Sequence, residues 1–166
     1  MTASTEAANL ATIAARAADR MKGEDIAVLD VSGPLVITDA FVLVSADNER
    51  LVSAIVDEVE DDLRDAGVKP IRREGVREGR WALLDYGMLV VHVFRDEERD
   101  FYGLDRLYRD SPLIEVDGVE PPERPGAYAD DVDVRSVESI DEIPLAGEGP
   151  AEGDSDDDYY YYDDEQ

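Results

Sequence analysis

The sequence contains no cysteine and only one histidine, His92. The absence of cysteine excludes a disulfide framework and a thiolate metal site, and one histidine cannot form a histidine-based metal cluster. No apolar run is long enough to cross a bilayer, and the N-terminus lacks the apolar stretch of a secretory signal. We therefore expect a cytoplasmic protein that binds no membrane, metal or other cofactor.

Basic residues are also scarce, with 16 lysines and arginines against 42 acidic residues and a formal net charge of −26. The segment 117–166 is the most unbalanced, because its only basic residues are Arg124 and Arg135. Affinity for nucleic acid depends largely on neutralising phosphates, so sequence-specific nucleic-acid binding is not expected. The partner is expected to be a basic protein surface, unless the acidity serves solubility alone.

Hydrophobic periodicity predicts an α/β domain that ends near Val116. Apolar positions at helical spacing predict one helix over 6–22, closed by Gly23, and another over 48–66, with Asp47 as N-cap and Gly67 after its end. Short apolar runs predict strands, and a short final helix broken at Gly103 follows them. The predicted strands cover 26–31, 41–46, 68–72, 81–85 and 88–94, and the final helix covers 96–109.

The expected architecture is a single mixed sheet flanked by helices. The strand at 68–72 follows a helical crossover, which predicts a parallel pairing. The strand at 88–94 is apolar on both faces, which predicts a central position. The remaining segment, 117–166, is Pro-rich and then low in complexity, so we expect a disordered acidic tail.

Catalytic chemistry has little support in the sequence. There is no glycine-rich phosphate loop, and Asp131 and Asp133, the one Asp-x-Asp pattern, lie in the tail. His92 on a central strand is more typical of a buried, hydrogen-bonded residue than of a catalyst. An enzyme would have to use Asp30 and Asp39, the two acids expected at neighbouring strand ends. We expect a protein that is not an enzyme.

Aromatic side chains and arginines concentrate between Glu78 and Tyr108. Aromatic residues and arginine are the usual anchors of protein interfaces, so this segment is the expected recognition surface. The arginines between Arg72 and Arg80 form the one basic cluster. They are either a solvated loop that balances nearby acids or a second binding element.

Several sequence blocks of this chain together resemble the ribosomal silencing factor family, also called Iojap-like. The blocks are LDV, ITD-x-FV, EGRW, LLDYG, VVHVF, ER-x-FY and LDRLY, and the similarity runs from about Ala7 to Val116. The resemblance implies a fold similar to nucleotidyltransferases without their catalytic acids. It also implies binding to large-subunit ribosomal protein number fourteen at the intersubunit face. Such binding blocks joining of the small subunit and represses translation under nutrient limitation, and free members of the family are often homodimers.

Carried onto this chain, the family blocks supply two groups of site residues. The expected partner-binding residues are Trp81, Tyr86, Arg99, Phe101, Tyr102 and Leu107. The expected framework residues are Asp39, Leu84 and His92, of which Leu84 and His92 are expected to be buried. An assembly chaperone for the large subunit and a nucleotidyltransferase-like enzyme remain the alternative functions.

Overall fold

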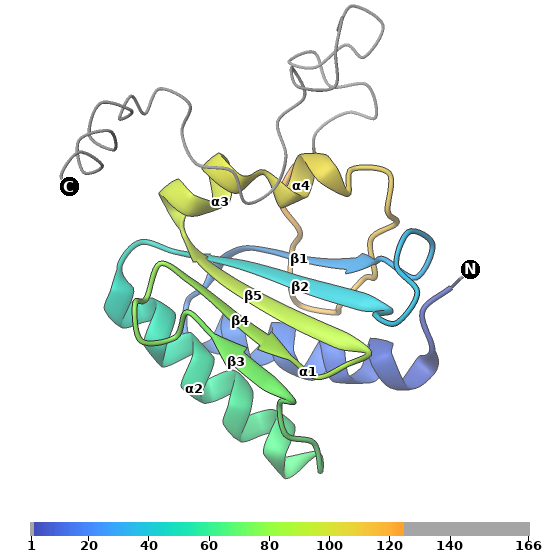
Figure 1. Ribbon diagram of the computed structural model, residues 1–166, viewed down its shortest axis with the longest axis horizontal. Helices are drawn as coiled ribbons and strands as arrows, with labels where there is room; N and C mark the ends of the chain where they lie inside the picture. Colours follow the sequence, from blue (N-terminus) through green and yellow to red (C-terminus); the bar gives the residue numbers. More distant parts are fainter. Residues whose placement is uncertain (1, 125–166) are drawn as a thin grey trace, which may run out of the picture.

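The computed structural model describes residues 2–124, which form one mixed five-stranded sheet with the strand order β1-β2-β5-β4-β3. Helices α1 and α2 cover one face, α3 and α4 lie over the other, and the segment after α4 passes along the β1 edge toward α1 (Figure 1). This arrangement confirms the expected fold class. The elements are α1 (Thr5–Arg20), β1 (Glu24–Asp30), β2 (Ala40–Ala46), α2 (Glu49–Asp65), β3 (Arg72–Glu74), β4 (Trp81–Asp85), β5 (Leu89–Arg95), α3 (Asp96–Tyr102) and α4 (Leu104–Leu107).

The β5 strand lies at the centre of the sheet, as its apolar faces predicted. Leu89, Val91 and Val93 join the core under α1 and α2, whereas Val90 and Phe94 join the smaller core on the other face. Neighbouring residues of a strand point to opposite faces, and here both faces are covered. β5 pairs in parallel with β2 and antiparallel with β4.

The third strand differs from the prediction. A parallel strand at 68–72 was expected, but β3 covers Arg72–Glu74 and pairs antiparallel with β4. The short connection from Gly75 to Arg80 can join only antiparallel neighbours. Gly75 has a φ of 75°, and a Cβ atom there would lie 2.0 Å from the Trp81 carbonyl oxygen. Val68 packs against the core without joining a strand.

At the helix ends, one predicted capping residue is wrong and one predicted helix break is confirmed. The N-cap of α2 is Asn48 rather than Asp47, because the Asn48 side chain accepts a hydrogen bond from the Leu51 N–H at 2.8 Å. Gly103 separates α3 from α4 with a left-handed φ of 64°, as expected for a helix break. This break turns the chain so that α4 and the residues after it return across the sheet. No described helix is long and apolar enough to cross a membrane.

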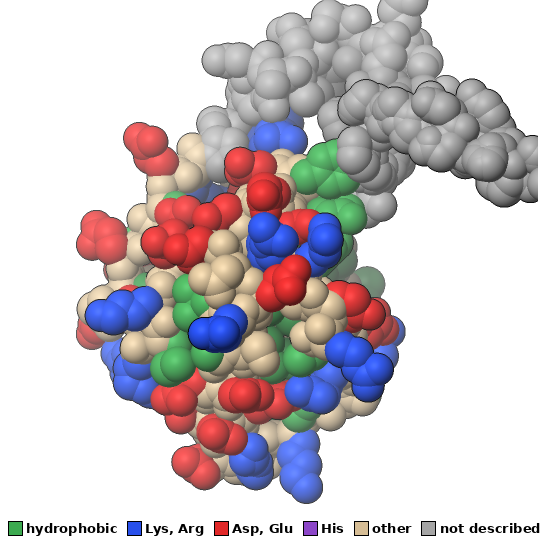
Figure 2. All heavy atoms as spheres, turned by 90° about the vertical axis from the view of Figure 1, so that its left-hand side faces the viewer, with side chains coloured by type: hydrophobic (Ala, Val, Ile, Leu, Met, Phe, Trp, Pro, Cys, Tyr) green, Lys and Arg blue, Asp and Glu red, His purple; other side chains and the backbone are tan. Residues whose placement is uncertain are grey.

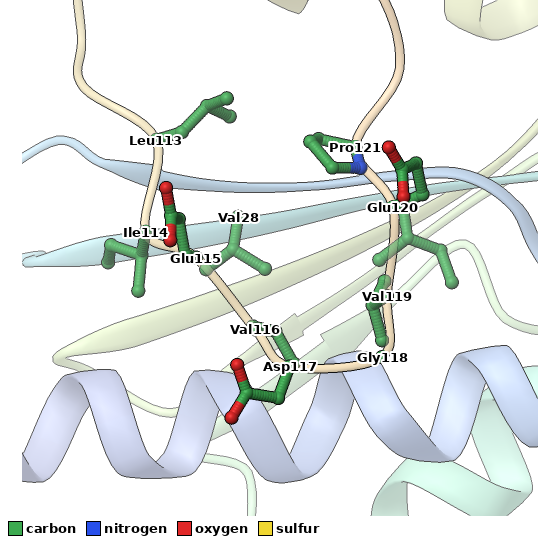
Figure 3. Close-up of a pocket in the computed structure, with 11 residues that line it drawn as sticks. Val28, Leu113, Ile114, Glu115, Val116, Asp117, Gly118, Val119, Glu120 and Pro121 are labelled. Atoms are coloured by element: carbon green, nitrogen blue, oxygen red, sulfur yellow. The ribbon is translucent and has the colours of Figure 1, made fainter.

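After α4 the chain runs along the outer edge of β1. The Asp30 N–H donates to the Pro112 carbonyl and the Ile114 N–H donates to the Val28 carbonyl, each at 2.8 Å. Figure 3 shows this segment passing beside β1 and then turning at Asp117 and Gly118. Covering an edge strand in this way removes a site of unwanted strand pairing. The expected acidic tail began at position 117, but residues 117–124 are described and Val119 packs against the core. The rest of the expected tail, from 125 onward, lies outside the described residues.

Candidate partner-binding site

A chain of aromatic rings leads from the protein surface into the core on the α3 side of the sheet. Phe101 contacts Tyr102 with ring centroids 4.9 Å apart, and Tyr102 contacts Trp81 at 4.6 Å. Trp81 in turn stacks on Phe94 at 5.1 Å, and Phe94 is fully buried. The outermost ring, Phe101, is 38% exposed, whereas Tyr102 and Trp81 are half-buried. Three of the six expected partner-binding residues therefore form one continuous stack.

His92 holds the Trp81 indole in place. The Trp81 Nε1–H donates to His92 Nδ1 at 3.1 Å, so the neutral imidazole carries its proton on Nε2. Burial, together with the charge of Arg99, lowers the pKa of His92 to about 3. The ring is therefore neutral at physiological pH. His92 and Leu84 are both buried, as predicted, and His92 contacts no described carboxylate or nucleophile that would make it a catalyst.

Arg99 is buried, which corrects its assignment as a partner-binding residue. Its guanidinium forms a bidentate ion pair with Asp105, at 2.9 and 3.0 Å. It also donates to the Asp25 carbonyl at 2.6 Å and to Ser45 Oγ at 3.1 Å. These contacts join α3 to β1, β2 and the start of α4. A buried arginine that has its hydrogen bonds satisfied in this way serves as framework.

Tyr86 is also buried, and its expected place on the docking surface is wrong. Side chains alternate between the two faces of a strand. Tyr86 therefore points to the same face as Ala82 and Leu84 and joins the core under α1 and α2. Its hydroxyl is buried without a hydrogen-bond partner. Burial is the main cause that raises the pKa of Tyr86 to about 12.

The two acids at neighbouring strand ends hold the start of α1. Asp30 accepts from the Ala3 N–H at 2.9 Å, and Asp39 accepts from the Ser4 N–H at 3.0 Å. Asp30 also accepts from the Ser32 N–H and hydroxyl. Burial opposes ionisation of Asp30, but these hydrogen bonds outweigh it and keep the pKa below its usual value. Within residues 2–124 no group of three ligating side chains could hold a metal ion.

Exposed apolar side chains complete the candidate surface. Leu107 on α4 is 52% exposed, as expected of a contact residue. Val36 and Ile37, which were not among the expected site residues, are 97% and 78% exposed in the loop between β1 and β2. Apolar residues beside a Gly-Pro turn signal were a clue, but the sequence alone could not separate an exposed loop tip from a buried one.

The basic cluster is largely balanced by acids of the domain itself. Arg72 pairs with Glu74 and Asp85, and Arg73 pairs with Glu60 at 2.6 Å. Figure 2 shows basic and acidic side chains interspersed over one face of the molecule. This geometry favours a solvated, internally balanced loop over a second binding element.

Comparisons with known proteins agree with these features. Residues 4–141 match the model of a family described as ribosomal silencing factor during starvation, a match that continues past Val116. The chain is 39% identical to the ribosomal silencing factor of Bacillus subtilis over 105 residues, which are 63% of this chain and 89% of that protein. It is 36% identical to the factor of Halalkalibacterium halodurans, over 66% of this chain and 94% of that one.

A solved structure supports the same relationship. The crystal structure of a Chromobacterium violaceum protein superposes with a TM-score of 0.61 at 30% identity. The superposition covers 72% of this chain and 92% of that one. The fold and the sequence comparisons therefore point in the same direction.

Proposed function

Because the chain belongs to the ribosomal silencing factor family, we propose that it represses translation by occupying the intersubunit face of the large ribosomal subunit. Its proposed partner is large-subunit ribosomal protein number fourteen, and nutrient limitation is the proposed condition for repression. A folded domain docked on the joining face would exclude the small subunit sterically. This mechanism requires no catalysis and no cofactor.

The observation that carries the proposal is the exposed end of the aromatic stack. Phe101 presents its ring at the surface, and Tyr102, Trp81 and Phe94 support it from behind. An anchor that is rigid before binding loses little conformational entropy when the partner arrives. Aromatic residues in such positions carry much of the affinity of protein interfaces.

The charge of the whole chain supports a protein partner on a subunit rich in RNA. A net charge of −26 disfavours contact with RNA phosphates. A basic ribosomal protein surface would attract the same charge. Repulsion from the surrounding RNA would thus help to restrict the domain to its protein partner.

The remaining features of the proposal are a cytoplasmic location, a homodimer of the free protein and the absence of enzymatic activity. Asp30 supports the last point most strongly, because both of its carboxylate oxygens accept hydrogen bonds, and Asp39 accepts one from the Ser4 N–H. A nucleotidyltransferase-like enzyme would need such carboxylates free to hold metal ions.

Sedimentation with separated ribosomal subunits tests the proposal. The full chain should pellet with large subunits and lower the yield of joined ribosomes when small subunits are added. Phe101→Ala should weaken binding by more than about 1 kcal/mol. Ile71→Ala is the control. It also truncates an exposed apolar residue, but Ile71 directly precedes β3, the edge strand at the opposite end of the sheet from β1.

Two results would contradict the proposal in different ways. If the wild-type chain stays in the supernatant at low salt with excess subunits, subunit binding is wrong. If the chain binds the free ribosomal protein but not mature subunits, an assembly chaperone is the better function.

A further inference from the structure

The loop between β1 and β2 carries two bulky apolar side chains directly into solvent. Val36 is 97% exposed and Ile37 is 78% exposed. Both stand next to Leu35, which packs against the core on the α3 side of the sheet. Two adjacent aliphatic residues that contribute so little to the core are unfavourable on a surface unless something covers them.

The structure holds this loop in a defined conformation. The Val31 N–H donates to the Asp39 carbonyl at 2.9 Å, and the Leu35 N–H donates to the Val31 carbonyl at 3.0 Å. Thr38 Oγ1 donates to the Gly87 carbonyl at 3.1 Å, which ties the loop to the hairpin between β4 and β5. The exposed tip is therefore presented by a loop that is fastened at both ends, and it is organised for binding in advance.

A groove adjoins the loop tip and connects it with α4. Its volume is about 530 Å³, and its apolar wall consists of Pro34, Leu35, Leu107, Tyr108 and Pro112. This space is large enough for apolar side chains of a partner. Leu107 belongs both to this wall and to the expected partner-binding residues, so the groove continues the candidate site toward the loop tip.

The charged groups that line the groove are acidic. Asp30 and Asp110 lie in its lining, and no lysine or arginine does. An apolar wall with carboxylates at its border would repel RNA phosphates and attract a protein segment with basic side chains. The lining therefore favours a ribosomal protein over ribosomal RNA as the occupant.

We propose that the Val36–Ile37 tip and the Leu35–Leu107 groove form a second, aliphatic half of the docking surface for the large-subunit ribosomal protein. The inference rests on the proposed function and extends it. The partner would place aliphatic side chains in the groove and over the tip, with a lysine or arginine directed toward Asp110. The matching surface of the partner should therefore carry both aliphatic and basic side chains.

Binding to purified large subunits, measured with the full chain, tests this inference. The double variant Val36→Ser/Ile37→Ser should bind at least tenfold more weakly, because burial of one aliphatic side chain corresponds to roughly tenfold or more in affinity. Its thermal unfolding should match that of wild type, since both side chains are exposed. Ile71→Ser, at an aliphatic residue 73% exposed that belongs neither to the tip nor to the groove lining, should weaken binding much less.

Charge reversal provides an independent arm. Asp110→Lys should also weaken binding, and the loss should be greater at low salt than at high salt. The same change at an acid remote from the groove, Asp57→Lys on α2, should have a smaller effect.

The outcomes separate this inference from the proposed function. If the wild-type chain binds subunits and the double variant binds equally well, the aliphatic half is wrong and the proposed function stands. If the wild-type chain does not bind, both are overturned. If the double variant loses only self-association in sedimentation equilibrium, the surface pairs with a second copy and the inference is wrong.

Discussion

His92 should make a measurable contribution to the destabilisation of the folded domain by acid. In the unfolded chain the imidazole has a pKa near 6.5, whereas in the folded domain burial and Arg99 lower it to about 3. Above pH 6.5 both states are neutral and His92 has no effect. Below that value the unfolded state takes up a proton that the folded state does not, so the free energy of unfolding falls as the pH falls.

The size of the effect follows from these two pKa values. At pH 5.5 the unfolded imidazole is protonated about ten to one while the folded imidazole remains neutral, which costs about 1.4 kcal/mol. At pH 5 the loss is about 2 kcal/mol, and it continues to grow until the pH reaches the folded pKa. For a domain of this size such a loss is a substantial part of the total stability.

Urea unfolding at several pH values measures the effect, with His92→Asn as the matched variant. The Asn side-chain oxygen can replace Nδ1 as acceptor for the Trp81 N–H, but the amide does not titrate. Other titrating groups are common to both proteins, so the difference between them isolates His92. Between pH 7.5 and 5.5 the wild type should lose about 1.4 kcal/mol more than the variant.

Nuclear magnetic resonance offers a direct check, because the chain has one histidine and therefore one set of imidazole signals. The chemical shifts of the carbon-bound ring protons should stay constant from pH 7.5 to 4.5. Titration of these signals near pH 6.5, or parallel stability curves for wild type and His92→Asn, would refute the reasoning.

The other predictions concern the framework of the site and use urea unfolding at neutral pH. Arg99→Gln should lower the free energy of unfolding by roughly 2–4 kcal/mol, because it leaves Asp105, the Asp25 carbonyl and Ser45 without their donor. Tyr86→Phe should leave stability unchanged or raise it by up to about 1 kcal/mol, since it removes a buried hydroxyl that has no partner; a loss of stability would reveal a partner for that hydroxyl. Gly103→Ala should cost about 1 kcal/mol, because the left-handed φ of 64° disfavours a Cβ atom.

Local patterns in the sequence were sufficient for much of the fold. The apolar residues on both faces of the strand at 88–94 predicted the central position of β5, and Gly103 marked the break between α3 and α4. The placement of β3 was wrong, because three exposed residues carry no hydrophobic pattern and their pairing depends on the turn that follows. Strand pairing of this kind is decided by contacts that a linear pattern does not contain.

The candidate site was harder to predict because exposure is a property of the whole fold. Arg99 is typical of an interface anchor in the sequence, but three segments that are far apart in the chain converge on its guanidinium. Tyr86 is buried because its side chain points to the same face of the sheet as Leu84. The sequence does not show which face the long helices cover, so this burial became evident only in the folded structure. Conversely, Val36 and Ile37 lie among apolar neighbours in the sequence, and only the folded loop leaves them exposed.

The buried polar groups of the described domain support a binding role on physical grounds. A catalytic site keeps a reactive group available in a cleft, with its pKa tuned for proton transfer or nucleophilic attack. Here Asp30 is held by hydrogen bonds at the start of α1, Arg99 is held between strands and helices, and His92 is kept neutral against Trp81. Each of these groups fixes a neighbouring element in place. Of the three, His92 fixes the Trp81 ring and Arg99 fixes α3, so these two hold the aromatic rings behind Phe101 in place, which favours binding by a preformed contact surface.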